Sequence, residues 1–198
     1  MKQKIIQEIK ESIKLKESIT VDQHLILQIE RVANLIVEAL NAGGKILVAG
    51  NGGSAADAQH IVGELVNRFM FDRPPLSGIA LSTDTSVLTA VSNDYGYSFV
   101  FAKQVEALAR ENDLFLAIST SGNAENIIKA LESAKKLGVK TVGMSGETGG
   151  KMFGLCDECI CVPSTATPRI QEAHITIAHI ICGLVESAVF GPKQKSCE

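Results

Sequence analysis

The sequence predicts an α/β fold: a three-layer α/β/α sandwich around a five-stranded parallel sheet, with added N-terminal helices. Short unbroken apolar runs alternate with segments of helical periodicity, as in strands that are covered on both faces and joined by helices. No linker, repeat or low-complexity tract divides the 198 residues. We therefore expect a single domain over 1–198, with 1–42 as a helical extension involved in oligomerisation.

The elements are expected in the following order. Apolar residues keep helical spacing from Lys2 to Asn41, with a break near Ser18–Thr20, and a glycine-rich stretch then ends the helical region. The expected strands cover 45–49, 78–81, 114–119, 140–145 and 158–163. The expected helices that follow the first strand cover 54–69, 85–92, 98–110, 124–137 and 168–190.

The last expected helix is apolar around most of its circumference. Its apolar residues include Ile175, Ile177, Ile180, Ile181, Leu184 and Val185. A helix of this kind must be buried on several sides. In a small domain this favours packing against another subunit, so we expect a symmetric homo-oligomer.

Composition excludes two classes of partner. The net charge of -3 provides no basic field, so nucleic acid is not the expected partner. No apolar run reaches membrane-spanning length, so we expect no membrane partner. The stretch Met1–Lys16 lacks the continuous apolar segment of a signal peptide, which predicts a cytoplasmic protein.

The five cysteines allow two interpretations. Cys156 and Cys159 are separated by two residues and Cys161 follows, a spacing that invites a zinc site. The chain has no matching second cluster, and Cys159 and Cys161 alternate with apolar residues in a strand-like run. Reduced thiols that pack as small apolar side chains are the favoured interpretation.

A glycine-rich turn, Gly50 to Ser54, joins the first strand to a helix. Free backbone N–H groups at such a turn can bind an anion or a sugar. The turn also matches the dinucleotide pattern G-x-G-x-x-A. However, the acidic residue after the second strand, Asp84, lies well beyond the usual spacing of about 20 residues. Neither this turn nor the later one has the lysine of a P-loop, so nucleotide binding is not favoured.

The helix after this turn carries His60 and Glu64 four residues apart. This spacing places an imidazole and a carboxylate on one face of the helix. The pair suggests acid–base or metal chemistry close to the ligand of the turn.

Two further polar segments follow strands or short helices. Ser119, Thr120 and Ser121 precede a helix N-terminus and predict a phosphate cradle, although a hydroxyl cap without a ligand is the alternative. Asn93 and Asp94 are expected in a loop, where they would offer acceptors to sugar hydroxyls. An Asx-turn explains those two residues almost equally well.

A fourth polar set lies near the start of the last helix. It consists of Arg169, Gln171, Glu172, His174 and His179. His179 interrupts an apolar run, and such a residue alone is more often a satisfied core histidine than a catalytic one.

Together these residues resemble the sugar isomerase (SIS) domain family, and within it the phosphoheptose isomerases. The resemblance is carried by Gly50–His60 with Glu64, by Asn67-Arg68-Phe69, by Ser92-Asn93-Asp94, by Ile118–Asn123 and by Arg169–Glu172 with His174 and His179. It implies a flavodoxin-like fold and a cytoplasmic homotetramer. The implied reaction converts sedoheptulose 7-phosphate to D-glycero-D-manno-heptose 7-phosphate, the first step towards ADP-heptose and the heptose of lipopolysaccharide.

The resemblance also implies site residues. It implies one zinc per subunit, held by His60, Glu64, Gln171 and His179. The implied substrate contacts are Asn51, Gly52, Gly53, Ser54, Arg68, Asn93, Asp94, Ser119, Thr120, Ser121 and Gln171. One residue departs from the family pattern, because Ala124 stands where the family commonly has a serine.

Ketose–aldose isomerisation moves a proton between neighbouring carbons, which requires a base and an acid. Glu64 and His179 are the catalytic candidates, and a metal could polarise the substrate oxygens. Gln171 and His179 are about 12 Å apart along a regular helix. One metal reaches both only if the helix bends, if Gln171 precedes its regular part, or if they serve different subunits. We expect a neighbouring subunit to complete the site, with Glu64 and His179 coming from different chains.

A second class of function remains open. Relatives of the SIS fold include non-enzymatic sugar-phosphate-binding regulators, such as a replication-initiation partner. A regulator has no need of a carboxylate beside His60, whereas an isomerase needs a base. Glu64 therefore favours the enzyme.

Overall fold

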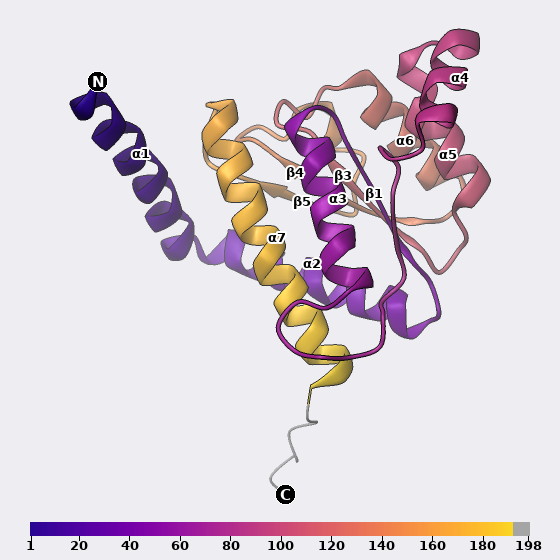
Figure 1. Ribbon diagram of the computed structural model, residues 1–198, viewed down its shortest axis with the longest axis horizontal. Helices are drawn as coiled ribbons and strands as arrows, with labels where there is room; N and C mark the ends of the chain where they lie inside the picture. Colours follow the sequence, from indigo (N-terminus) through magenta and orange to yellow (C-terminus); the bar gives the residue numbers. More distant parts are fainter. Residues whose placement is uncertain (192–198) are drawn as a thin grey trace, which may run out of the picture.

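The computed structural model describes residues 1–191 and contains a five-stranded parallel sheet between two layers of helices (Figure 1). Its strands are β1 (Ile46–Gly50), β2 (Gly78–Ala80), β3 (Leu114–Ile118), β4 (Lys140–Ser145) and β5 (Glu158–Cys161). They lie in the order β2-β1-β3-β4-β5, and every neighbouring pair is parallel. The predicted α/β/α sandwich is confirmed.

Side chains of each strand alternate between two buried faces. In β1, Ile46 and Val48 join one apolar cluster, and Leu47 and Ala49 join the other. Because both clusters exclude water, β1 and β3 are apolar throughout, as the unbroken runs of the sequence indicate.

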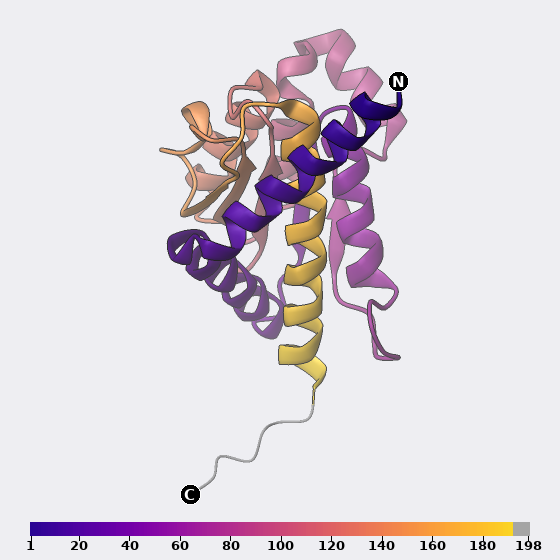
Figure 2. The same cartoon turned by 90° about the vertical axis from the view of Figure 1, so that its left-hand side faces the viewer.

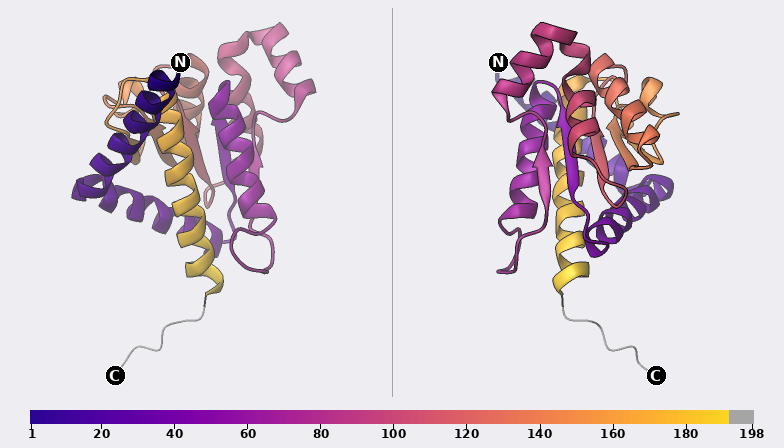
Figure 3. Two further views of the ribbon diagram at one scale, coloured as in Figure 1. Left: turned by 60° about the vertical axis from the view of Figure 1, so that its left-hand side comes forward. Right: turned by 90° about the vertical axis from the view of Figure 1, so that its right-hand side faces the viewer.

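Helices cover both faces of the sheet (Figure 3). One layer consists of α2 (Gln23–Asn41), α3 (Gly53–Val66) and α7 (Thr167–Phe190). The other consists of α4 (Thr85–Tyr95), α5 (Val100–Leu108) and α6 (Glu125–Lys136), with the short 3-10 helix η1 (Tyr97–Phe99). From β1 the chain crosses to β2 on one side, and from β3 it crosses to β4 on the other. Right-handed crossovers in opposite directions therefore place α3 and α6 on opposite faces.

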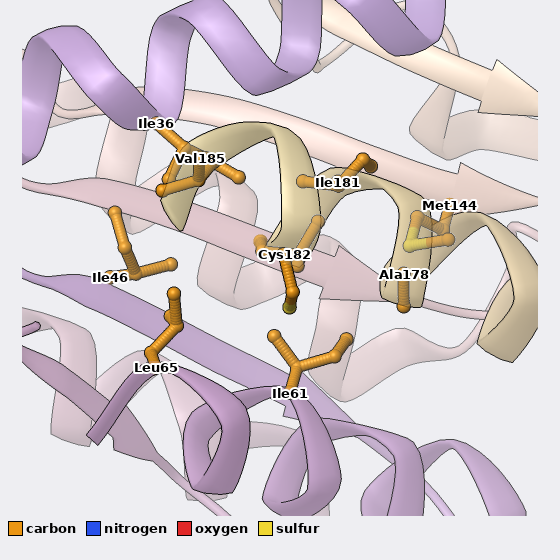
Figure 4. Close-up of a pocket in the computed structure, with 10 residues that line it drawn as sticks. Ile36, Ile46, Ile61, Leu65, Met144, Ala178, Ile181, Cys182 and Val185 are labelled. Atoms are coloured by element: carbon orange, nitrogen blue, oxygen red, sulfur yellow. The ribbon is translucent and has the colours of Figure 1, made fainter. Parts of the chain in front are cut away.

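The contact between α3 and α7 is densely packed. Ile61 and Leu65 of α3 face Cys182 and Val185 of α7 above Ile46 of the sheet (Figure 4). The void among these side chains is about 10 Å³, which is close to the minimum for one water molecule. The two helices are thus fixed side by side.

The N-terminal helices break later than expected. Helix α1 (Lys2–Val21) continues through the predicted break, where the Ser18 and Thr20 hydroxyls bond back to carbonyls of α1. The break falls at Asp22, whose side chain accepts a hydrogen bond of 3.0 Å from the Leu25 amide and caps α2. Helix α1 then crosses α7 as a projecting arm (Figure 2).

One predicted loop is helical. Helix α4 runs through Tyr95, so Asn93 and Asp94 lie in its last turn and not in a loop or an Asx-turn. The helix was predicted over 85–92, and the short polar residues that follow hid its last turn. Its cap is Asp84, which accepts a hydrogen bond from the Val87 amide at 3.0 Å.

Helix α7 is long and apolar enough to span a bilayer by length and composition alone, which the sequence analysis had not expected. Its buried residues, among them Ile177, Ile181 and Val185, pack in the core of the sandwich. Core helices of soluble proteins can be equally long and apolar. The helix therefore provides only weak evidence for a membrane segment.

Candidate active site

Two turns meet at the carboxyl edge of the sheet. They follow β1 and β3, the neighbouring strands at which the strand order reverses, and this is the usual ligand position in such sheets. Between them lies a hollow of about 220 Å³. Its lining residues are Asn51, Ser54, Ile118, Ser119, Thr120, Ser121, Ala124 and Gln171. The structure thus brings both predicted turns and Gln171 to one pocket.

Two glycines shape the first turn. Gly52 has a φ of 55°, a left-handed conformation that side chains rarely adopt. A Cβ on Gly53 would stand 2.6 Å from Gln171 Nε2, so this position has room only for a glycine while Gln171 keeps its place. The N-terminus of α3 and the start of α7 therefore approach each other directly over the pocket.

The second turn presents free donors. Within residues 1–191 the Thr120 and Ser121 amides donate to no backbone or side-chain acceptor, and no side chain caps the N-terminus of α6. The Ser121 hydroxyl accepts a 3.2 Å bond from the Asn123 amide within the turn. A hydroxyl cap of α6, the alternative to a phosphate cradle, is thus absent from the described chain. The turn keeps the amide and hydroxyl donors that an anion requires.

The orientation of Asn51 depends on residues that the sequence analysis missed. Asn51 and Asn126 exchange two side-chain hydrogen bonds of 2.9 Å, and the Tyr97 hydroxyl donates to Asn51 Oδ1 at 3.1 Å. Asn126 is buried on α6 and Tyr97 begins η1. No local pattern links these three positions, because their contact arises from the tertiary fold.

A second polar group lies further along α3 and α7. The rings of His60 and His179 approach to 2.8 Å between their Nε2 atoms, and Glu64 Oε1 lies 3.1 Å from His60 Nε2. The three ligand-type atoms are all within 4.8 Å of one another. Two imidazoles and a carboxylate form a donor set suited to zinc, and they also include an acid–base pair.

This geometry corrects the expectation of a divided site. Glu64 and His179 lie together within one chain, so the prediction that they come from different chains is wrong. Gln171 instead borders the pocket between the two turns, beside Gly53 at the N-terminus of α3. Because α7 already begins at Thr167, Gln171 lies inside the helix, roughly 12 Å along it from His179.

Asp57 is another residue that the sequence analysis missed. It lies on α3 one turn before His60, and its Oδ2 atom is buried without a hydrogen-bond partner in the described chain. Burial raises the pKa of this carboxyl, and the nearby His60 opposes the rise. Helix α3 therefore carries an unsatisfied acceptor one turn before His60.

The position of His179 depends on contacts with Phe69, whose loop is bonded to Glu186 near the end of α7. The Phe69 ring stacks on His179 at 5.7 Å between ring centres, with an interplanar angle of 22°. The buried Glu186 carboxylate accepts hydrogen bonds from the Phe69 and Met70 amides at 2.8 and 2.7 Å and from Arg73 at 2.9 Å. Burial acts to raise the pKa of Glu186, but these hydrogen bonds and the Arg73 charge outweigh it and lower the pKa.

His174 is a buried residue of α7 that contacts the end of β4. It is 1% exposed, and its Nε2 donates to the Ser145 carbonyl at 3.1 Å, while Nδ1 has no partner in the described chain. Burial lowers the pKa of His174 from its ordinary value near 6.5 to about 4, against the effect of this hydrogen bond. His174 is therefore a neutral structural residue that holds the end of β4 below Ser119.

Three predicted contacts are not brought to the pocket of this chain. Arg68 is exposed beyond the end of α3, roughly 20 Å along the helix from Gly53. Asn93 and Asp94 are exposed on α4 and bond to each other at 2.8 Å.

The strand order and the donor-rich turns define the class of doubly wound α/β proteins that bind small anionic ligands at the switch point. The SIS domain family matches residues 9–146. The phosphoheptose isomerase of Aneurinibacillus thermoaerophilus is 60% identical over 185 residues, 93% of each chain. Phosphoheptose isomerase 2 of Campylobacter jejuni is 56% identical, covering 95% of this chain and 93% of the relative. The chain belongs to the phosphoheptose isomerase family of SIS domain proteins.

A solved structure shows the same fold. The phosphoheptose isomerase of Neisseria gonorrhoeae superposes with a TM-score of 0.88 at 40% identity, covering 94% of this chain and 98% of that one. The match extends over almost the whole of both chains, N-terminal helices included.

Proposed function

We infer that the chain is an aldose–ketose isomerase that converts sedoheptulose 7-phosphate to D-glycero-D-manno-heptose 7-phosphate. This is the first step towards ADP-heptose and lipopolysaccharide heptose. One observation carries the inference beyond family membership. The pocket of the donor-rich turn is bordered by Ser54 of α3 and Gln171 of α7, and the His60–Glu64–His179 group lies further along the same two helices. One binds the phosphate and the other performs the proton transfers.

The phosphate of the substrate lies on the turn of Ser119, Thr120 and Ser121. The free amides support this assignment, and so does the uncapped N-terminus of α6, whose partial positive charge favours an anion. Ala124 removes one hydroxyl from this turn. The remaining donors outnumber the oxygens of one phosphate group.

The carbonyl end of the open-chain sugar lies at the histidines. Glu64 takes the proton from C1 and returns it to C2. His179 gives a proton to O2 and takes one from O1, so that an enediol forms and then collapses to the aldose. His60, which lies between these two side chains, orients the Glu64 carboxylate.

We propose one zinc ion per subunit at His60, Glu64 and His179, and two nitrogens and one carboxylate oxygen fit that ion. Because a carboxylate bound to zinc is a weaker base, Glu64 would act as ligand and as base in different states. When bound, it would polarise the substrate oxygens. Gln171 stays a predicted fourth ligand, although it borders the pocket. Arg68, Asn93 and Asp94 stay predicted substrate contacts, and they are consistent with a neighbouring chain that completes the pocket.

We also propose a cytoplasmic homotetramer that uses residues 1–42 in assembly. The support is apolar side chains of α1 that are 44–60% exposed. They are Ile5, Ile6, Ile9 and Ile13. Ile180 and Leu184 of α7 are also about half exposed and line a groove of about 370 Å³ beside α1 and α2. A single chain leaves this surface to water, and a second copy would cover it.

The activity is tested with sedoheptulose 7-phosphate and a coupled assay for the aldose product. Glu64→Gln keeps the shape of the side chain and removes its basic oxygen. We expect turnover to fall at least a hundredfold, the low end of about 10²–10⁴ for acid–base catalysis, with substrate binding retained by calorimetry. A wild-type protein that binds the sugar but yields no aldose would indicate a regulator. A Glu64→Gln protein that keeps more than about a tenth of wild-type kcat would exclude Glu64 as the base.

A further inference from the structure

Three thiol groups lie close together at β5, outside the candidate site. Cys161 Sγ lies 3.8 Å from Cys159 Sγ. A Cβ on Gly143 of β4 would stand 2.9 Å from Cys156 Sγ and 2.9 Å from Cys159 Sγ. The glycine thus leaves the space in which these two sulfur atoms approach each other.

The two thiols beside Gly143 differ in exposure. Cys159 is 4% exposed, whereas Cys156 is partly exposed and lines a surface hollow of about 160 Å³. Lys135, Lys140 and Asp157 border the same hollow. The pKa of Cys159 is raised to about 12, first by its hydrogen bond with Cys156 and then by burial. Cys156 is therefore the thiol of this pair that meets solvent.

An accessible thiol next to a second thiol is the arrangement of a redox pair. We propose that Cys156 and Cys159 form a peroxide-sensitive pair whose disulfide acts on the phosphate turn. The Cys156 thiolate attacks a peroxide oxygen. The O–O bond breaks, the sulfur becomes a sulfenic acid, and the departing hydroxide takes up a proton. The Cys159 sulfur then attacks the sulfenic sulfur, an S–S bond forms, and the oxygen leaves as water with the Cys159 proton.

The thiols connect to the phosphate turn through the 3-10 helix η2 (Gly150–Met152). The Met152 methyl group also lies 2.9 Å from the position of a Gly143 Cβ, beside both sulfurs. The Met152 amide donates to the Gly122 carbonyl at 3.0 Å, and the Lys151 amide donates to Asn123 Oδ1 at 3.1 Å. Formation of the disulfide draws Cys156 inward and displaces Met152. We expect the turn to lose these two supports in part.

The modification is tested by treating the full chain with hydrogen peroxide and measuring intact mass. We expect a loss of two hydrogen atoms that dithiothreitol reverses. The Cys161→Ser protein should still lose them, because its Cys156 and Cys159 are intact. The Cys156→Ser protein should not. Retention of all thiol hydrogens by the wild type, or their loss by Cys156→Ser, would overturn the assignment, and this readout is independent of enzyme activity.

The effect on the turn rests on the proposed function and is measured by kinetics of the same samples. Oxidised wild type should show a several-fold higher KM for sedoheptulose 7-phosphate, with kcat changed less and KM restored by dithiothreitol. Peroxide-treated Cys156→Ser should keep the KM of its untreated form. A disulfide that forms while KM stays constant would overturn the link to the phosphate turn. Absence of all turnover before oxidation would instead contradict the isomerase.

Discussion

The buried His174 ring makes the stability of the fold depend on pH. Its pKa is lowered to about 4, whereas the unfolded chain binds this proton near 6.5. Between pH 6.5 and 4 the unfolded chain therefore binds a proton at this residue and the folded protein does not. The free energy of unfolding keeps its full value above pH 6.5 and declines as the pH falls towards 4. Between pH 7 and 5 we expect a loss of about 2 kcal/mol from this group.

Urea unfolding at several pH values measures this loss. His174→Gln is the matched variant, because its side-chain amide can still donate to the Ser145 carbonyl but binds no proton. Its stability should vary much less over the same pH interval. Equal slopes for wild type and variant would show that His174 does not cause the dependence.

Glu186 is the residue on which the loop beside His179 depends. Glu186→Ala leaves the Arg73 charge buried without its partner, and such a change costs about 3–5 kcal/mol of unfolding free energy. Glu158→Ala is the control, because it breaks the exposed pair with Arg31, which is worth about 0–1 kcal/mol. Chemical denaturation should separate the two variants clearly. A similar small loss in both would contradict a supporting role for Glu186.

At the scale of elements, the contact of α3 with α7 can be tested through two glycines of one helix. Gly53→Ala places a methyl group 2.6 Å from Gln171 Nε2, so the flexible amide must move. We expect a clear rise in KM with a small change in stability. Gly63→Ala meets nothing within 4 Å and should raise stability by about 0.5–1 kcal/mol with KM unchanged. Equal KM values for both variants would contradict a role of Gln171 in the substrate pocket.

The sequence predicts the helices and strands better than it predicts the contacts between residues of different elements. Apolar runs locate all five strands, and the inner strands β1 and β3 are buried on both faces. The break at Asp22 and the helical placement of Asn93 were missed, because caps and backbone bonds decide them locally. Spacing places His60 and Glu64 on one face of α3, but no pattern indicates that Glu186 holds the Phe69 loop. That contact spans more than a hundred residues and exists only after α7 has packed.

At the scale of the whole molecule, α1 contributes little to its own chain. Its exposed apolar stripe should drive assembly, so Ile9→Glu is expected to convert the oligomer to smaller species by light scattering. The exposed charge of Glu11→Gln on the same helix provides a control that should leave the mass unchanged. An Ile9→Glu protein of wild-type mass would exclude this stripe from the interface.

The parallel course of α3 and α7 also bears on the length of the proposed substrate. In the proposed site the phosphate lies near Gln171 and Gly53, and the proton transfers occur at His60 and His179, eight residues further along α7 than Gln171. The packed contact between the two helices fixes this separation. A shorter ketose phosphate held by the same turn would then end before the histidines, and a longer one would have to bend. We therefore expect the distance between two helix positions to select the length of the sugar, without contacts to its middle carbons.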